Sequence, residues 1–363
     1  MNILFYTTDM RFGGAQRVIS ILANKFSQQG HMVSIFMYNE YDTIAYQLDR
    51  RVSIEHLDNK FRIYKLLHNI KQLKFTRKRI IDFAPDVIIS FYAIDTILAW
   101  LASKGLDIPI VYSQRCDPYN TSFKEHLYEK LAIRLAKHIV FQSTGAQHYY
   151  SKKTQEKSHI IFNPLQVEFL PKKQYMPDDD KKQRVIVAVG RLSEQKNHKL
   201  LITAFNSIKD DIPNVVLQIF GDGPLRESLQ DYINSLHLQE HVILMGNKNN
   251  VTDYVSQADV FVLPSLYEGQ PNALLEAMCI GVPCISTDWS PKGTIADLIK
   301  DGENGIIVAN NNVEDMIVAI EKMLSDNDSA RKMGCNATQL SHIINSDAIC
   351  QIWLTTISEI VNK

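Results

Sequence analysis

The chain has 363 residues, of which 45% are hydrophobic and 22% are charged. This length exceeds that of a typical single domain, and the composition excludes a disordered or fibrous chain, so we expect two globular domains. The net charge of −1 hides an asymmetry, because residues 1–170 carry 22 Lys and Arg against 15 Asp and Glu, whereas the remainder carries 17 against 25. The basic half and the acidic half are therefore expected to meet different partners.

Cysteine usage and hydropathy limit the cellular setting. The five cysteines are odd in number and lack the spacing of metal ligands, which argues against a disulfide framework or a zinc site and favours a reducing cytoplasm. The first seven residues have the pattern of a short strand rather than of a signal peptide. No apolar stretch approaches the roughly 18–20 residues that span a bilayer. We expect a cytoplasmic protein that is soluble or peripheral on the inner face of the plasma membrane.

Short apolar runs alternate along the chain with amphipathic segments, which is typical of βαβ units. In the first half, strands are predicted at residues 2–7, 32–38, 87–91, 108–113 and 138–142. In the second half they are predicted at residues 184–189, 215–220, 241–245, 260–264, 283–286 and 305–308. Helices are predicted at residues 15–29, 225–236 and 272–279. Continuous apolar strands indicate parallel sheets covered on both faces, and hence an α/β fold.

Residues 60–81 carry eight Lys and Arg and no acidic residue, and their apolar residues recur at helical spacing. On a helix, Lys71, Lys74 and Lys78 share one stripe. Such a helix can rest on anionic lipid or hold a pyrophosphate-bearing lipid acceptor. An ordinary surface helix is the alternative.

Residues 162–180 interrupt the strand–helix alternation with three prolines and the acidic run Asp178–Asp180, and we interpret them as an interdomain linker. The predicted domains are residues 1–165 and 166–340. A C-terminal helix at about 341–363 could pack back on the first domain. The acidic run resembles a metal-binding D-x-D sequence, but within a linker it is interpreted as solvated.

Ligands of open α/β sheets bind at the carboxyl ends of strands, so the loops there are candidate sites. After strand 184–189, Arg191 and Lys196 could hold a diphosphate and stabilise it as a leaving group, although a solvated loop is the alternative. Gly221 and Gly223 precede a helix that could receive an anion, and Gly13-Gly14 make a similar turn. None of these turns is a complete G-x-G-x-x-G sequence, which argues against a dinucleotide-binding enzyme.

The most specific segment runs from Glu268 to Glu276. Pro271 suits the first turn of a helix, and Gly281 suits its end. Glu268 then precedes the helix, Glu276 lies inside it, and free N–H groups near its start can bind a phosphate oxygen. Two carboxylates beside an anion site suit the hydroxyls of a sugar and a ribose.

This segment resembles the E-x7-E motif of the retaining glycosyltransferases of family 4, which have the GT-B fold: two Rossmann-like domains whose parallel sheets face each other across a cleft. The likeness continues through Gly13-Gly14, Arg191, Lys196, Gly221–Pro224 and Asp301–Gly305. It implies that Arg191 and Lys196 bind the donor diphosphate. It also implies that Glu268 contacts the donor sugar and that Glu276 holds the ribose. The other implied donor contacts are Gly14, Gly221, Gly246 near the base, Asn272, Ala273 and Leu274.

The likeness is weaker at two places. Asp297 stands where the family usually has Glu. In the first domain, Arg115 and Asp117 follow a strand where relatives often place His or Glu. They are candidate acceptor residues, with a structural loop as the alternative.

The resemblance implies transfer of a hexose or N-acetylhexosamine, with retention, from a nucleotide sugar to a glycan. Family frequency favours UDP, with GDP as the alternative. The basic first half favours a lipid-linked oligosaccharide acceptor in surface-polysaccharide synthesis. No metal cofactor and no nucleic-acid partner are expected. A GT-B sugar-nucleotide epimerase and a non-catalytic glycan-binding subunit are the competing hypotheses.

Overall fold

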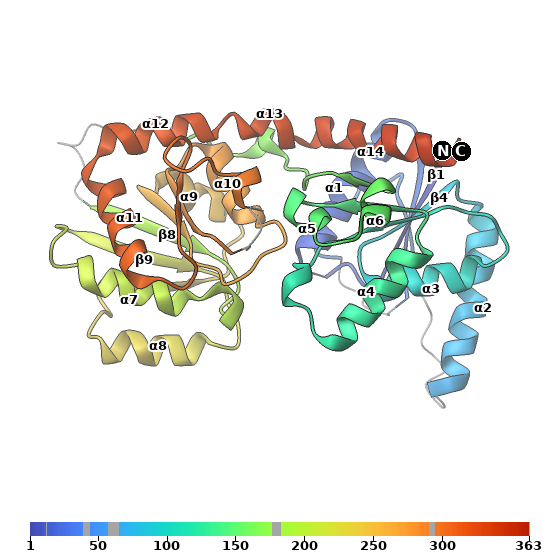
Figure 1. Cartoon of the computed structure of the whole chain (residues 1–363), viewed down its shortest axis with the longest axis horizontal. Coiled ribbons are helices and arrows are strands. Elements are labelled where there is room, and N and C mark those ends of the chain that lie inside the picture. Colours follow the sequence, from blue (N-terminus) through green and yellow to red (C-terminus); the bar gives the residue numbers. More distant parts are fainter. Residues whose placement is uncertain (12, 39–43, 57–64, 176–182, 290–294, 363) are drawn as a thin grey trace. The chain divides into compact units, whose positions relative to one another are not determined.

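The computed structural model describes all residues except 12, 39–43, 57–64, 176–182, 290–294 and 363, and it does not describe the side chains of residues 65–71. The chain divides into two compact units, which are described separately (Figure 1). Unit 1 comprises Met1–Leu165 and Ile344–Lys363, and unit 2 comprises Gln166–Ile343. No helix among the described residues is both long and apolar enough to cross a membrane.

Unit 1 is built on a seven-stranded parallel sheet with the order β3-β2-β1-β4-β5-β6-β7. Its strands are β1 (Asn2–Thr7), β2 (Met32–Met37), β3 (Ser53–His56), β4 (Val87–Ser90), β5 (Ile110–Ser113), β6 (His138–Phe141) and β7 (Ser158–Ile160). Its helices are α1 (Gly14–Gln28), α2 (Lys65–Phe83), α3 (Ala93–Ser103), α4 (Phe123–Leu135), α5 (Thr144–His148), α6 (Lys152–Glu156) and α14 (Ser346–Val361).

Successive side chains of each strand point to opposite faces of this sheet, and helices cover both faces. Phe5 of β1 packs on one face with α1 and with Trp353 of α14. Leu4 and Tyr6 of β1 belong to a separate cluster on the opposite face, which includes Ile80 of α2. The C-terminal helix α14 therefore completes the core of unit 1, although the sequence of unit 2 separates it from the rest of that unit.

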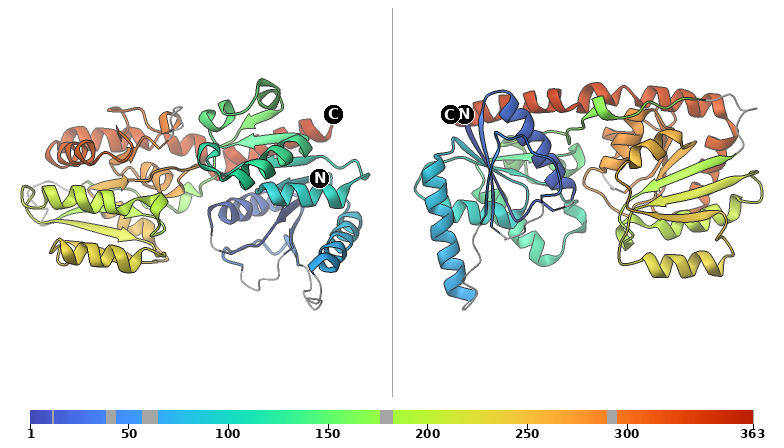
Figure 2. Two further views of the ribbon diagram at one scale, coloured as in Figure 1. Left: turned by 60° about the horizontal axis from the view of Figure 1, so that its bottom comes forward. Right: turned by 180° about the vertical axis from the view of Figure 1, so that it is seen from behind.

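Unit 2 contains a six-stranded parallel sheet with the order β10-β9-β8-β11-β12-β13. Its strands are β8 (Arg184–Val189), β9 (Val215–Phe220), β10 (Val242–Gly246), β11 (Val260–Leu263), β12 (Cys284–Thr287) and β13 (Ile306–Val308). Its helices are α7 (His198–Ile208), α8 (Arg226–Ser235), α9 (Val251–Gln257), α10 (Asn272–Ile280), α11 (Val313–Ser325) and α12 (Asn327–Ala337), and the short α13 (Leu340–Ile344) follows them. Figures 1 and 2 show helices on both sides of the sheet.

Both sheets follow the strand order of a Rossmann fold, so the expected α/β class is confirmed. In unit 1 the order reverses between β1 and β4, and in unit 2 it reverses between β8 and β11. At such a point the two following loops diverge to opposite faces and leave a crevice at the carboxyl edge. The fold thus marks one candidate binding position in each unit.

All eleven predicted strands are observed, each within two residues of its predicted ends, and the three predicted helices are also confirmed. The sequence failed to predict β3 and β7, which are short strands at the two edges of one sheet. The basic segment forms α2 from Lys65 onward, and residues 57–64 lie outside the described part. Within the predicted linker, Val167–Phe169 form a 3₁₀ turn, whereas Asp178–Asp180 lie outside the described residues.

Candidate functional site

The reversal point of unit 2 brings two predicted site residues into direct contact. Lys196 ends the 3₁₀ turn Glu194–Lys196 after β8, and Glu268 lies in the loop after β11. Lys196 Nζ donates to Glu268 Oε1 over 2.5 Å, and Ser265 Oγ donates to the same oxygen over 2.6 Å. The carboxylate is buried, with 7% of its side chain exposed, so this ion pair is mostly removed from water.

A residue that the sequence analysis missed joins the two loops. Gln195 Nε2 donates to the carbonyl of Tyr267 over 2.9 Å, and the N–H of Leu266 donates to the carbonyl of Gln195 over 2.8 Å. These bonds hold the β8 loop beside the β11 loop and so position Lys196 against Glu268. Arg191 lies in the same β8 loop and is exposed, so its guanidinium is accessible to an anion.

Close backbone packing between the loops after β8 and β9 requires glycine. A Cβ atom on Gly221, whose φ is +128°, would lie 2.0 Å from the carbonyl oxygen of Gly190. A Cβ atom on Gly223 would lie 2.4 Å from the carbonyl oxygen of Leu192. These contacts give the predicted Gly-x-Gly turn a definite purpose, which is to let two backbone segments meet beside the Lys196 loop.

The second carboxylate of the predicted pair lies on α10. Glu276 is 6% exposed, and the helix stops at Gly281, which adopts the left-handed conformation at φ +94°. At the other end, Pro271 is the N-cap residue, and its carbonyl accepts from the N–H of Leu274 over 3.1 Å. Of the amides predicted to meet phosphate, that of Leu274 is thus already engaged. Ala273, in the first turn, has no preceding helical carbonyl for its N–H.

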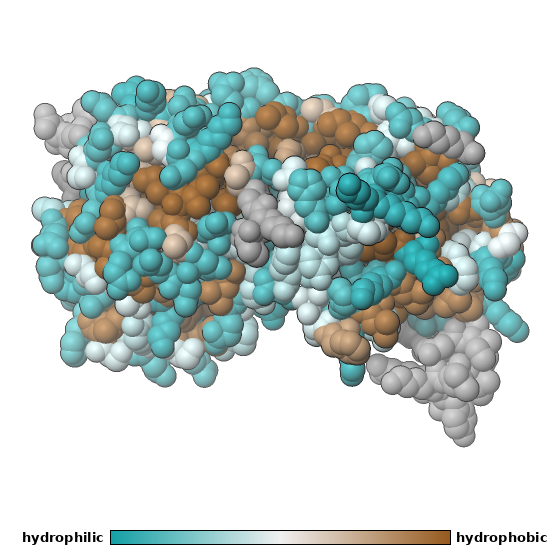
Figure 3. Space-filling view, viewed as in Figure 1, coloured by the Kyte–Doolittle hydropathy of each residue, from teal (hydrophilic) through white to brown (hydrophobic). Residues whose placement is uncertain are grey.

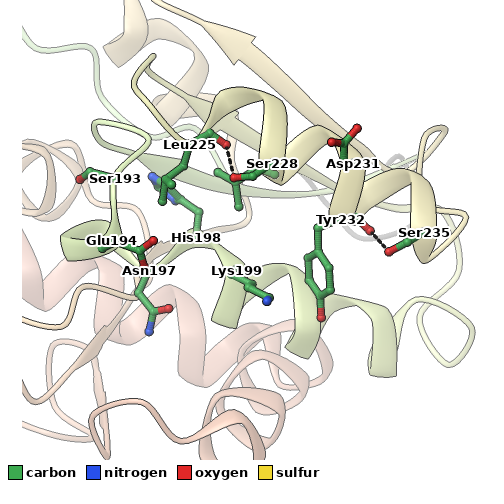
Figure 4. A pocket seen from close by; sticks show the side chains of 11 residues that line it. Ser193, Glu194, Asn197, His198, Lys199, Leu225, Ser228, Asp231, Tyr232 and Ser235 are labelled. Atoms are coloured by element: carbon green, nitrogen blue, oxygen red, sulfur yellow. Dashed lines mark hydrogen bonds between the residues drawn. The ribbon is translucent and has the colours of Figure 1, made fainter.

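A buried imidazole lies directly behind the lysine loop. His198 is 3% exposed, and burial, together with the positive charge of Lys196, lowers its pKa to about 4. It is therefore neutral near pH 7 and adds no charge beside Lys196. His198 also lines a hollow of about 450 Å³ between α7 and α8 (Figure 4). There the hydroxyl of Ser235 donates to the carbonyl of Tyr232 in α8, and that of Ser228 donates to the carbonyl of Leu225, the N-cap residue of the same helix.

The remaining predicted residues of unit 2 are spread around this edge. Gly246 ends β10, and its carbonyl accepts from the N–H of Gly221 over 2.9 Å. Asp301 accepts a hydrogen bond from the N–H of Ile307, and Asn304 accepts one from the N–H of Lys300. The segment Asp301–Gly305 therefore builds the turn that leads into β13. Asp297 lies in a 3₁₀ turn and is half-buried.

Unit 1 has a polar cluster at its own reversal point, and the sequence analysis missed it. Asp95, in the first turn of α3, accepts from Thr8 Oγ1 over 3.0 Å and from Tyr38 Oη over 2.9 Å. These partners follow β1 and β2. The other carboxylate oxygen is buried without a hydrogen-bond partner among the described residues. Burial is the main cause that raises the pKa of Asp95 to about 7.

The guanidinium of Arg115 lies after β5. It stacks 4.5 Å from the centre of the Phe91 ring, and its Nη1 donates to Asn163 Oδ1. Its Nε and Nη2 atoms are buried and have no hydrogen-bond partner in the part of the chain that the structure describes. Burial lowers the pKa of Arg115 to about 9, because the cation is poorly solvated. Arg115 is therefore a buried cation whose hydrogen-bonding capacity is only partly used by the described residues.

The other candidate acceptor residues differ in what their side chains do. Asp117 is buried and accepts from the N–H of Tyr119 and from Asn120 Nδ2, so it caps a 3₁₀ turn. Lys74 and Lys78 are exposed on α2, whereas the side chain of Lys71 lies outside the described part. Gly14 is the first residue of α1, next to the extended N-cap Gly13.

Comparison with known proteins identifies both halves of the chain. Residues 12–169 match the family described as Glycosyltransferase Family 4, and residues 172–340 match Glycosyl transferases group 1. A GalNAc-α-(1→4)-GalNAc-α-(1→3)-diNAcBac-PP-undecaprenol α-1,4-N-acetyl-D-galactosaminyltransferase of Campylobacter jejuni is 26% identical, over 100% of this chain and 99% of its own.

Two further proteins extend the comparison. A UDP-Gal:α-D-GlcNAc-diphosphoundecaprenol α-1,3-galactosyltransferase of Escherichia coli is 34% identical over 39% of this chain and 37% of its own. Among solved structures, HepE of Anabaena in complex with UDP superimposes with a TM-score of 0.81 at 18% identity, covering 99% of this chain and 100% of that one. This likeness confirms the GT-B fold expected from the sequence.

Proposed function

The chain belongs to the glycosyltransferases, with a family 4 domain followed by a group 1 domain, and we propose that it transfers a hexose or N-acetylhexosamine, with retention, from a UDP-sugar to a lipid-linked oligosaccharide. The observation that carries the donor site is the buried contact of Lys196 with Glu268 at the reversal point of unit 2. It supplies a cation for a diphosphate and a carboxylate for sugar hydroxyls at one place.

We assign the donor groups by the charge that each side chain offers. Lys196 and the exposed Arg191 bind the diphosphate, and the first turn of α10 adds the amide of Ala273 to a phosphate oxygen. Glu268, fixed by Ser265, accepts from hydroxyls of the sugar. Glu276, buried on α10, accepts from the ribose.

The reaction that suits this arrangement is a displacement on one face of the sugar. The acceptor hydroxyl attacks the anomeric carbon while the bond from that carbon to the diphosphate oxygen breaks. The hydroxyl proton passes to the departing diphosphate. Lys196 and Arg191 offset the charge that develops on this leaving group, which lowers the barrier. These two cations supply the charge that a metal ion would otherwise supply, so the proposal includes no metal cofactor.

A lipid-linked acceptor is supported by the relatives and by unit 1. The relatives from Campylobacter and Escherichia are named for undecaprenol-linked diphosphate substrates. Two buried donor nitrogens of Arg115, Nε and Nη2, have no partners among the described residues. A diphosphate of the acceptor that reached them would accept their hydrogen bonds and offset the charge. The donor named for the Escherichia relative and the UDP bound to HepE support UDP as the nucleotide of the donor.

The donor assignment is tested by calorimetry with UDP. Glu268→Gln should retain UDP affinity but lose transfer, because its partner is the sugar. Glu276→Gln should weaken UDP binding itself, since its partner is the ribose. Equal losses of UDP affinity in both variants would contradict these roles.

The reaction is tested with a panel of sugar nucleotides, with and without an undecaprenyl-diphosphate-linked glycan. Transfer that requires the acceptor, with an α-anomeric product from an α-linked donor by NMR, supports the proposal. An isomerised donor or free sugar formed without acceptor would identify an epimerase. Absence of turnover with every donor, combined with glycan binding, would identify a non-catalytic subunit.

The basic helix α2 supplies a separate proposal, attraction to an anionic membrane surface. Each exposed lysine near such a surface contributes on the order of 1 kcal/mol. Reversing Lys71, Lys74 and Lys78 to Glu should release the protein from anionic liposomes, and raised salt should imitate that release. Identical co-sedimentation of wild type and the triple variant at low and high salt would show that α2 is an ordinary surface helix.

A further inference from the structure

Helix α4 of unit 1 exposes large apolar side chains to solvent. Phe123 is 85% exposed, Leu127 59%, Tyr128 46% and Leu131 41%. Phe123, Leu127 and Leu131 are spaced four residues apart, so on a helix they form one stripe. In Figure 3, brown hydrophobic surface is interleaved with teal in the region where Figure 1 draws α4.

Helix α4 departs from the usual amphipathic pattern, in which apolar side chains are buried and charged side chains are exposed. Its buried side contains Ala132 and Ile133 but also Glu129, whose carboxylate accepts from Tyr112 Oη over 2.8 Å and from Tyr150 Oη over 3.2 Å. At 100° per residue, the stripe of Phe123, Leu127 and Leu131 points away from that buried side. A carboxylate is thus held inside the unit while the hydrophobic side chains face outward.

The charges on the outward side of α4 are all positive. Lys124, Lys130 and Arg134 are exposed and lie beside or within the apolar stripe. The two acids of this helix, which is described throughout, lie elsewhere: Glu129 is buried, and Glu125 reaches back to the N–H of Ser122 in a capping box. An aromatic and aliphatic stripe bordered only by cations has the composition of an interfacial helix.

We propose that this outward face of α4 inserts into the interfacial region of an anionic lipid bilayer. The proposal rests on the proposed function, because a lipid-linked acceptor must be met at a membrane. A second copy of the chain is a poorer partner, since a twofold contact would bring Lys124, Lys130 and Arg134 against their own counterparts. An anionic lipid surface satisfies both the apolar stripe and these cations.

The test measures partition into phosphatidylcholine vesicles with and without phosphatidylglycerol. The variant Phe123→Ser/Leu127→Ser should bind the anionic vesicles at least about tenfold more weakly, because two large side chains lose their apolar contact. A matched control, Val318→Ser/Ile243→Ser, removes two exposed apolar side chains of unit 2 (62% and 42% exposed) and should bind as wild type does. Thermal unfolding should be unchanged in both, since all four side chains are exposed.

Three further measurements make the test decisive. Lys124→Gln/Lys130→Gln/Arg134→Gln should weaken the preference for phosphatidylglycerol, because the cations that border the apolar stripe are lost while those of α2 remain. Equal partition of wild type and the α4 variant would overturn the proposal. So would sedimentation of the wild type as a dimer and of the α4 variant as a monomer. Transfer to a short water-soluble acceptor should survive in the α4 variant. Its absence in wild type would instead refute the proposed function and leave the vesicle result to stand by itself.

Discussion

At the scale of single residues, the contact between Lys196 and Glu268 affects the stability of the protein as well as its donor site. In the free enzyme, each charge offsets the cost of burying the other, and Ser265 supplies a further donor to the carboxylate. A lysine in a solvated loop, the alternative considered for Lys196, could be replaced without changing the fold. In the structure its side chain is only 17% exposed, so that expectation applies to Arg191 rather than to Lys196.

Substitutions of Arg191 and of Lys196 should therefore differ in their effect on the stability of the protein. Arg191→Ala should reduce turnover by about 10²-fold without changing the free energy of unfolding. Lys196→Met should reduce turnover similarly but also destabilise the protein by about 2–3 kcal/mol, because it leaves a buried carboxylate unpaired. The double variant Lys196→Met/Glu268→Gln should recover most of that stability and remain inactive. Strictly additive losses in urea denaturation would show that the pair is not coupled.

The buried carboxylate of Asp95 should make the stability of unit 1 depend on pH. Its pKa is raised to about 7 from an ordinary value of 3.8, so the folded state retains a proton that the unfolded state has lost between these values. Stability should then fall as pH rises from about 4 to about 7, by up to about 1.4 kcal/mol per pH unit. Above about pH 8, where Asp95 is ionised in both the folded and the unfolded state, this contribution should remain constant.

Asp95→Asn keeps an oxygen that can accept from Thr8 and Tyr38 but cannot ionise. Its free energy of unfolding, measured against wild type, should rise as pH increases from about 5 to about 8. Urea denaturation of both proteins across that range measures this difference. Parallel pH curves would show that Asp95 is ionised, or protonated, equally in the folded and unfolded states.

At the scale of secondary-structure elements, the sequence predicted what burial dictates and missed what it does not. Strands such as β8 (RVIVAV) and β9 (VVLQIF) are almost entirely apolar because helices cover both of their faces. The edge strands β3 and β7 are only four and three residues long, with the sequences SIEH and SHI. Without a buried apolar side they have no period-two signal, and only pairing to β2 and β6 defines them.

The candidate site shows the same division. Residues carried by a family motif, such as Lys196 and Glu268, could be predicted, and the structure places them in contact. Asp95, Tyr38 and Gln195 could not, because each owes its position to the convergence of loops from distant parts of the chain. A single carboxylate in an amphipathic helix gives no sequence signal of burial. Strand order decides which loops meet, and local periodicity does not encode it.

The glycine turn between β9 and α8 permits a prediction that separates steric from conformational effects. Gly223→Ala introduces a Cβ atom 2.4 Å from the carbonyl oxygen of Leu192, whereas Gly302→Ala introduces one with no atom within 4 Å but at a φ of +73°. Gly302→Ala should cost about 1 kcal/mol of stability and leave UDP binding unchanged. Gly223→Ala should cost more and weaken UDP binding, because the loop of Lys196 must move. Equal UDP affinities, measured by calorimetry, would show that this packing does not shape the donor site.

At the scale of the whole molecule, two units with the same strand order differ in charge and in what completes their cores. Residues 1–170 carry 22 Lys and Arg against 15 Asp and Glu, which suits an anionic acceptor and a membrane, and the reverse balance lies in the remainder. Unit 2 has its own core around β8 and β9. Unit 1 depends on α14, the last helix of the chain, which supplies Trp353 and Ile357 to its core.

Separate cores predict that a ligand and a core mutation act on different units. UDP at about 100 times its Kd should stabilise unit 2 by about 2.7 kcal/mol. Trp353→Ala should destabilise unit 1 by about 3–5 kcal/mol, because it removes a fully buried side chain from α14. Hydrogen exchange resolved by peptide distinguishes the two effects: UDP should slow exchange in β8, β9 and α10, and Trp353→Ala should accelerate it in β1, β4 and α1. If Trp353→Ala accelerated exchange equally in both sheets, the two cores would unfold as one cooperative unit, and the assignment of α14 to unit 1 alone would fail.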